Sequence, residues 1–129
     1  MNLMDYRELL AKAKEVSKNA YAPYSKFGVG ACLLTDDGST FVGCNFENVS
    51  YGLTICAERN AIGTAIANGH RKFKAIALYS PNEDNCVPCG ACRQVLSEFQ
   101  DGDMDIITEI NGEPHIYKLS YLMPESFKL

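Results

Sequence analysis

The most informative stretches of this sequence are TICAER, residues 54–59, and PCGACRQ, residues 88–94. Each contains cysteine where a helix is predicted to begin. Cys89 and Cys92 are spaced i, i+3, so they can point the same way from the first turn of one helix. Cys56 begins the other helix, whose start can converge on them. The sequence therefore predicts three thiols gathered between two helix starts.

Hydrophobic periodicity and turn residues extend this pattern to the whole chain and predict the order α-β-β-α-β-α-β-β. Helices are expected at about 5–20, 56–68 and 90–99, and strands at 29–35, 41–46, 75–79, 105–110 and 116–119. Gly38 and Gly112 lie in the two expected hairpin turns. Because the sequence contains no repeat or linker, we expect a single domain over residues 1–129, of the α/β class with a mixed sheet.

The length and composition of the chain limit the role that a bound metal could have. The chain has 129 residues, of which 47% are apolar and 22% charged, as in ordinary globular proteins. A domain of this size buries enough surface to fold without metal or disulfides. A metal bound by the thiols would therefore serve function rather than folding.

Charge and hydropathy exclude several classes of function. Lysine and arginine number 12 against 16 acidic residues, a net charge of −4, which disfavours a surface that follows nucleic-acid phosphates. No apolar run approaches the roughly 20 residues of a membrane span, and the first residues lack the pattern of a signal peptide. We expect a cytoplasmic protein whose six cysteines stay reduced.

Three thiolates suit Zn²⁺ and leave its fourth tetrahedral position open, as catalytic zinc sites do. Such a centre carries a net charge of about −1, which the two helix N-termini and Arg59 can offset. Glu58 follows Cys56 by two residues, and such neighbours share no helix face. Glu58 can reach the metal's open side only if Cys56 lies at or before the helix cap.

Two other interpretations of the cysteines remain open. One is a structural zinc or a set of buried core thiols. The other is a redox pair, because Cys86 with Cys89 and Cys89 with Cys92 both form Cys-x-x-Cys. Neither explains the pairing of Cys56 with Glu58. Cys86 is expected to be a loop thiol, although it could offer the metal another ligand.

A cysteine-x-glutamate element followed by Pro-Cys-x-x-Cys is the pattern of zinc-dependent nucleobase deaminases, with cysteine in place of histidine at the first ligand. The sequence strongly resembles the small cytidine deaminases. The resemblance covers nearly the whole chain, from YSKF at 24–27 and NFEN at 45–48 through both thiol motifs to LMP at 122–124. It implies a three-layer α/β/α fold with a mixed five-stranded sheet.

The resemblance also implies an activity and its machinery. Cys56, Cys89 and Cys92 would hold Zn²⁺, and Glu58 would carry protons in the hydrolysis of cytidine, and of 2′-deoxycytidine, to the uracil nucleoside and ammonia in pyrimidine salvage. The implied assembly is a homotetramer.

The resemblance implies a substrate pocket as well. Phe27 would pack against the pyrimidine ring, Asn45 and Glu47 would bind a ribose hydroxyl, and the backbone at Ala57 would contact the base. Tyr51 and Phe127 match positions that can complete the pocket of a neighbouring subunit. The alternatives are a deaminase for another small molecule, such as a nucleoside antibiotic or a free base, and a zinc or redox protein without this activity.

Overall fold

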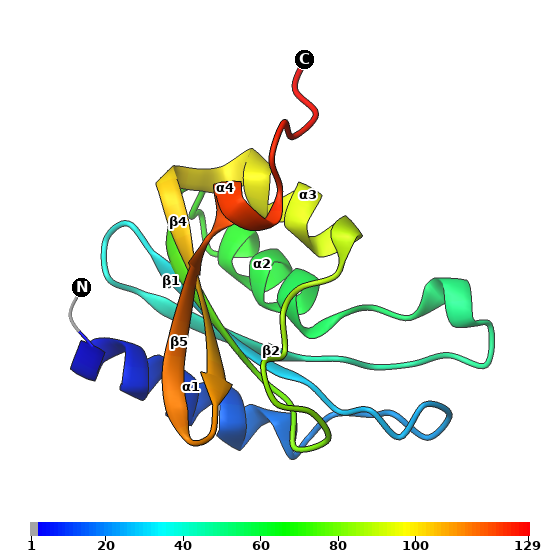
Figure 1. Cartoon of the computed structure of the whole chain (residues 1–129). Helices are drawn as coiled ribbons and strands as arrows, with labels where there is room; N and C mark the ends of the chain where they lie inside the picture. Colours follow the sequence, from blue (N-terminus) through cyan, green and yellow to red (C-terminus); the bar gives the residue numbers. More distant parts are fainter. Residues whose placement is uncertain (1–2) are drawn as a thin grey trace.

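A five-stranded sheet forms the centre of the molecule in the computed structural model, which describes residues 3–129 (Figure 1). The strands are β1 (Gly30–Thr35), β2 (Thr40–Cys44), β3 (Phe73–Tyr79), β4 (Gln100–Ile110) and β5 (Glu113–Lys118). The helices are α1 (Leu3–Ser17), α2 (Ala57–Ala67), α3 (Gly90–Phe99) and α4 (Leu119–Leu122), with a short 3-10 helix, η1 (Tyr51–Leu53), before α2.

The strand order is β2-β1-β3-β4-β5. All neighbouring strands run antiparallel except β3 and β4, which run parallel and are joined through α3. The expected mixed five-stranded sheet is therefore confirmed. Within residues 3–129, no helix is long and apolar enough to cross a membrane.

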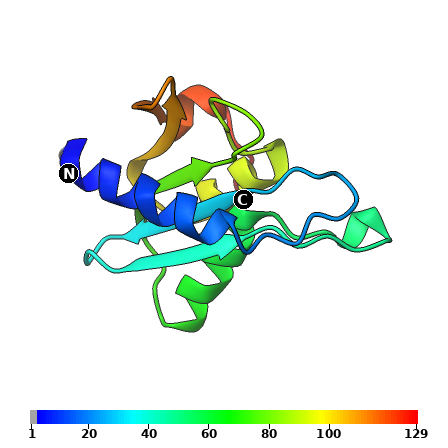
Figure 2. The same cartoon turned by 90° about the horizontal axis from the view of Figure 1, so that it is seen from below.

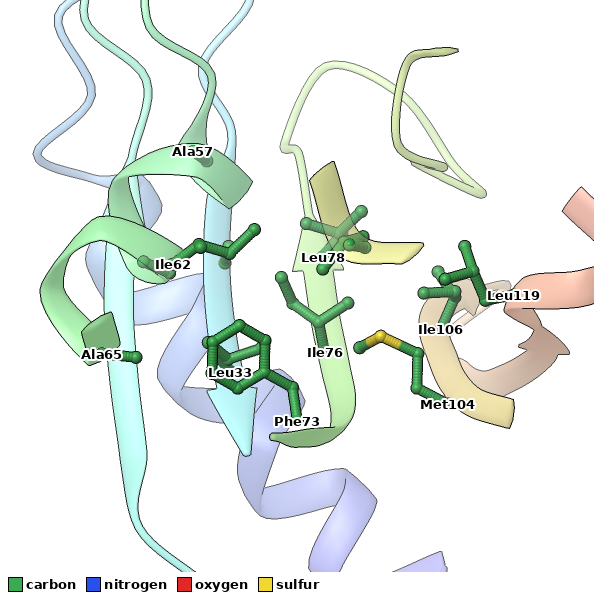
Figure 3. Close-up of a cluster of buried hydrophobic side chains, with 13 residues drawn as sticks. Leu33, Ala57, Ile62, Ala65, Phe73, Ile76, Leu78, Met104, Ile106 and Leu119 are labelled. Atoms are coloured by element: carbon green, nitrogen blue, oxygen red, sulfur yellow. The ribbon is translucent and has the colours of Figure 1, made fainter. Parts of the chain in front are cut away.

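Alternating side chains of the strands build a separate core on each face of the sheet. On one face, Cys32 and Ala77 pack beneath α1, which lies across the strands in Figure 2. On the other face, Leu33 and Ile76 pack with α2 and α3, as Figure 3 shows in part. This division gives the three layers, α/β/α, that the family resemblance implies.

Several predicted boundaries are wrong, each for a local reason. The first helix ends at Ser17 rather than 20, because the backbone turns there through hydrogen bonds from residues 18–20 to the carbonyls of residues 15–17. The second strand ends at Cys44 rather than Phe46, because Phe46 leaves β1 and pairs with Tyr21 and Ile55 instead. The helices η1 and α4 were not expected from periodicity.

Gly43 sets how closely α2 approaches the sheet. A Cβ added at Gly43 would lie 2.5 Å from the backbone nitrogen of Ala61 and 2.6 Å from the carbonyl oxygen of Ala57. The Asn60 side chain fastens the same contact by donating a 2.7 Å hydrogen bond to the carbonyl of Cys44. The start of α2 is thus held directly on β2.

We therefore expect Gly43→Ala to destabilise the protein by about 2–3 kcal/mol, because the backbone of α2 would have to move away. Gly63→Ala is the matched control, since Gly63 lies on α2 with nothing within 4 Å of an added Cβ. The control should gain up to about 1 kcal/mol from helix propensity. Urea unfolding at one protein concentration measures both, and equal stabilities would contradict the close approach.

Candidate active site

Three cysteine sulfurs meet between the starts of α2 and α3. Cys56 is the N-cap of α2 and Cys89 the N-cap of α3, both with extended backbone, while Cys92 is buried in the first turn of α3. Their Sγ atoms all lie within 4.8 Å of one another. The sequence predicted that Glu58 could reach the metal's open side only if Cys56 lay at or before the helix cap, and the structure places Cys56 at the cap.

This cluster fits zinc. Two sulfurs bound to one tetrahedral Zn²⁺ at about 2.3 Å stand about 3.8 Å apart, within the spread observed here. The side chains of the two cap residues, Cys56 and Cys89, make no capping hydrogen bond with the described residues. Both helix N-termini also direct positive dipole ends at the sulfurs, which favours thiolates. Cys56, Cys89 and Cys92 are therefore positioned to bind a metal.

Arg59 supplies positive charge to the cluster. Its Nη2 donates to the Cys56 sulfur at 3.5 Å, and its Nε is buried with no hydrogen-bond partner in the part of the chain described. Hydrogen bonds from the Cys92 thiol and then from Arg59 lower the pKa of the Cys56 thiol well below its usual range. The surroundings of Cys56 thus favour the thiolate, which is the form that binds zinc.

Glu58 is the acidic residue nearest this centre in the sequence, and it lies in the first turn of α2 with 5% of its surface exposed. Burial raises the pKa of its carboxyl group, and the negative charge of Cys56 adds to the rise. A raised pKa makes the carboxylate a stronger base, which suits a group that accepts a proton and later returns it.

Cys56, Cys89 and Glu58 line a pocket of about 320 Å³, whereas the buried Cys92 is not part of its lining. This volume falls at the small end of the range for small-molecule sites, and apolar groups dominate the lining. The sequence-predicted residues in the lining are Phe27, Asn45, Glu47, Cys56, Ala57, Glu58 and Cys89. The fold therefore brings residues from four separate stretches of sequence to one cavity.

Asn45 also holds the backbone around Phe27 in place, a role that the sequence did not indicate. Its Nδ2 donates to the carbonyl of Phe27 at 2.9 Å, and its Oδ1 accepts from the backbone N–H of Val29 at 2.9 Å. The amide thus fastens the segment that carries Phe27. One amide hydrogen and one lone pair are left for a ligand.

Tyr51 and Phe127 do not line this pocket. Tyr51 lies in η1, is 56% exposed and meets Tyr24 edge to face at 6.1 Å between ring centroids. Phe127 lies in the C-terminal segment and is 70% exposed. Within one chain, neither residue contributes to the cavity.

Sequence reasoning missed Ser25, Val29 and Val87 as pocket residues, and it left Cys86 open. Cys86 stands outside the cluster of three sulfurs and lines the pocket instead, where burial raises the pKa of its thiol to about 12. The Cys86 side chain is therefore a neutral thiol in the lining of the pocket. All six cysteines are free thiols.

Arg93 is a further residue that the motif alone did not explain. Its Nε donates to the carbonyl of Pro88 at 2.7 Å, and its Nη1 donates to the carbonyl of Leu122 at 2.7 Å. The first bond holds the residue that precedes Cys89. The second ties the end of α4 to α3, so the C-terminal part of the chain supports the thiol loop.

Comparison with known proteins agrees with this geometry. Residues 4–108 match the family model described as "Cytidine and deoxycytidylate deaminase zinc-binding region". The cytidine deaminase of Sporosarcina psychrophila is 45% identical over 96% of this chain and 92% of its own length. The crystal structure of cytidine deaminase from Burkholderia pseudomallei superposes with a TM-score of 0.87 at 43% identity, covering 94% of this chain and 98% of that one.

A second solved structure, the cytidine deaminase of Mycobacterium tuberculosis, has a TM-score of 0.85 at 39% identity and covers 97% of this chain and 98% of that one. A three-sulfur centre with an open side, facing a small-molecule pocket and a buried glutamate, is typical of zinc-dependent hydrolytic enzymes. Within that class, the chain belongs to the cytidine and deoxycytidylate deaminase family.

We expect Arg59→Ala to lower zinc affinity about 10- to 100-fold, because a group that supports metal ligands would be lost beside three thiolates. Competition with a chromophoric chelator at neutral pH measures the affinity. Arg71→Ala is the control, because the hydrogen bonds of the exposed Arg71 go to the backbone carbonyls of Ile66 and His70, at the end of α2 and just after it. Equal zinc affinities of the two variants would remove the proposed role of Arg59.

Proposed function

We propose that this protein is a hydrolytic cytidine deaminase, converting cytidine and water to uridine and ammonia. One observation carries the proposal: Cys56 and Cys89 of the thiol cluster line the same pocket of about 320 Å³ as the buried Glu58 and the candidate sugar-binding Glu47. A structural zinc module has no need of such a cavity beside its metal.

Zn²⁺ held by Cys56, Cys89 and Cys92 would supply a Lewis acid that acidifies water. Glu58 would take a proton from the attacking water and deliver it to N3 of the cytosine ring while the water oxygen adds at C4. The same carboxyl group then moves a second proton from the added oxygen to the amino group, which leaves as ammonia. Its raised pKa suits both directions of transfer.

The remaining pocket residues hold the nucleoside. Phe27 packs against the pyrimidine ring, and the backbone at Ala57 contacts the polar edge of the base. Asn45 and Glu47, which are 8% and 7% exposed, offer a donor and a charged acceptor to a ribose hydroxyl. This binding would orient C4 toward Glu58, which lowers the entropic part of the barrier.

We also propose a homotetramer in which Tyr51 and Phe127 complete a neighbour's pocket. The segments at 20–28 and 45–55 extend away from the sheet (Figure 1) and carry exposed apolar side chains, including Val49 at 79% and Leu53 at 63%. Large apolar groups gathered this way mark interfaces. A monomeric mass in solution would contradict the assembly.

The single domain over residues 1–129, the role in pyrimidine salvage and the location in the cytoplasm stay predictions.

We expect Glu58→Gln to retain zinc and to lose turnover of cytidine by about 100- to 10,000-fold, because the amide cannot carry protons. Ammonia release and zinc content per chain are measured together. Glu98→Gln is the control, since this exposed carboxylate on α3 lies outside the pocket and its removal should leave turnover unchanged. Turnover near the wild-type rate in Glu58→Gln would refute the proton-transfer role.

A nucleoside antibiotic is the second candidate substrate, because the blasticidin-S deaminase of Bacillus cereus is 33% identical over 69% of this chain. The polar sugar site favours cytidine over that substrate by roughly 100-fold in kcat/KM. A panel of cytidine, 2′-deoxycytidine and blasticidin S, followed by ammonia release, checks this preference. Preference for the antibiotic would reassign the substrate while leaving the deaminase chemistry in place.

A further inference from the structure

Both oxygens of the Glu47 carboxylate are already bonded by the turn that precedes Phe27. The backbone N–H groups of Tyr24 and Ser25 donate to Oε1 at 3.0 and 3.1 Å, and the Ser25 hydroxyl donates to Oε2 through a short hydrogen bond. Ser25 lines the pocket beside Glu47. The orientation of the carboxylate is therefore set before any ligand arrives.

Counting acceptor sites limits what Glu47 can bind. A carboxylate offers about four lone-pair positions, and the turn occupies three of them. One position remains, on Oε2, which suits a single sugar hydroxyl. The Ser25 hydrogen bond, ahead of the backbone bonds, also lowers the pKa of Glu47, so the carboxylate is a charged acceptor at neutral pH.

The same serine hydroxyl reaches the candidate base-binding residue. Ser25 Oγ accepts a hydrogen bond from the backbone N–H of Phe27 at 3.0 Å. Lys26, between them, has a φ of 63°, a left-handed conformation that is uncommon outside glycine. Such a conformation persists where surrounding bonds hold it, and the two bonds of Ser25 do so on either side of Lys26.

We propose that Ser25 is a positioning residue that acts through Glu47 and Phe27 and so sets how strongly the enzyme binds the sugar of its nucleoside. The inference rests on the proposed function and adds to it a residue that touches neither the metal cluster nor the candidate proton carrier. Its single proton is committed to Glu47 and its acceptor site to Phe27, so one hydroxyl couples the sugar and base subsites.

The test compares Ser25→Ala with Ser25→Thr. Loss of the hydroxyl in Ser25→Ala should raise KM for cytidine about tenfold with kcat within about twofold of wild type, because binding and not proton transfer is weakened. Ser25→Thr keeps the hydroxyl at an exposed position and should restore KM. Unchanged KM in Ser25→Ala, or a failure of threonine to restore it while alanine is impaired, would overturn the inference.

Two further measurements separate positioning from a general loss of structure. With 2′,3′-dideoxycytidine, which lacks the ring hydroxyls, Ser25→Ala should lower kcat/KM less than it does with cytidine, because only the part of the effect that acts through Phe27 remains. In a double-mutant cycle, Ser25→Ala combined with Glu47→Gln should raise KM for cytidine by less than the product of the two single effects, because serine acts in part through that carboxylate. Additive effects, or an equal loss with the dideoxynucleoside, would contradict positioning through Glu47.

Ammonia release by the wild-type protein distinguishes a failure of the proposed function from a failure of the inference about Ser25. If the wild-type protein releases no ammonia from cytidine, the proposed function fails whatever Ser25 does. If it does release ammonia and Ser25→Ala behaves as wild type, the positioning inference alone fails. Thermal unfolding of each variant shows that the comparison concerns folded protein.

Discussion

The close packing of α2 on β2 is the constraint on which the site depends. Gly43 lets the backbone of α2 approach the strand, and Asn60 fastens the helix to the carbonyl of Cys44. This packing places the first turn of α2 beside that of α3, so that Cys56 meets the cysteines of the second motif. The metal cluster is therefore a product of helix placement on the sheet, and the same placement turns Glu58 toward the pocket.

Charge distribution within the site follows from that packing. A cluster of three sulfurs lies beside one small cavity that two carboxylates also line, a concentration of negative charge that would be costly without offsets. The two helix N-termini and Arg59 offset the charge of the sulfurs. Backbone N–H groups and the Ser25 hydroxyl donate hydrogen bonds to Glu47. Glu58 is bonded by its own backbone N–H and by the Cys92 thiol, but burial outweighs these bonds and raises the pKa of its carboxyl group. Two glutamates in one pocket are thus driven toward different protonation behaviour, one fixed as an anion and one able to exchange protons.

Local patterns in the sequence were enough to predict much of this. The i, i+3 spacing of Cys89 and Cys92 placed them on one helix start, and α3 runs over the expected residues, Gly90–Phe99. The need for Cys56 to lie at a cap followed from its spacing to Glu58, and the structure places it there. The pocket residues came from resemblance to a family, because no periodicity links strand ends with helix starts that lie far apart in sequence.

What the sequence did not reveal depends on contacts between distant, irregular segments. The Asn45 amide fastens the turn before β1, and Arg93 joins α3 to the end of α4 across 29 residues. The most direct measurement of the whole arrangement is a zinc titration of protein stripped of metal. Ammonia release from cytidine should rise in proportion to bound zinc and level off at one ion per cluster of three sulfurs. Full deamination by protein that elemental analysis shows to be free of divalent metal would contradict it.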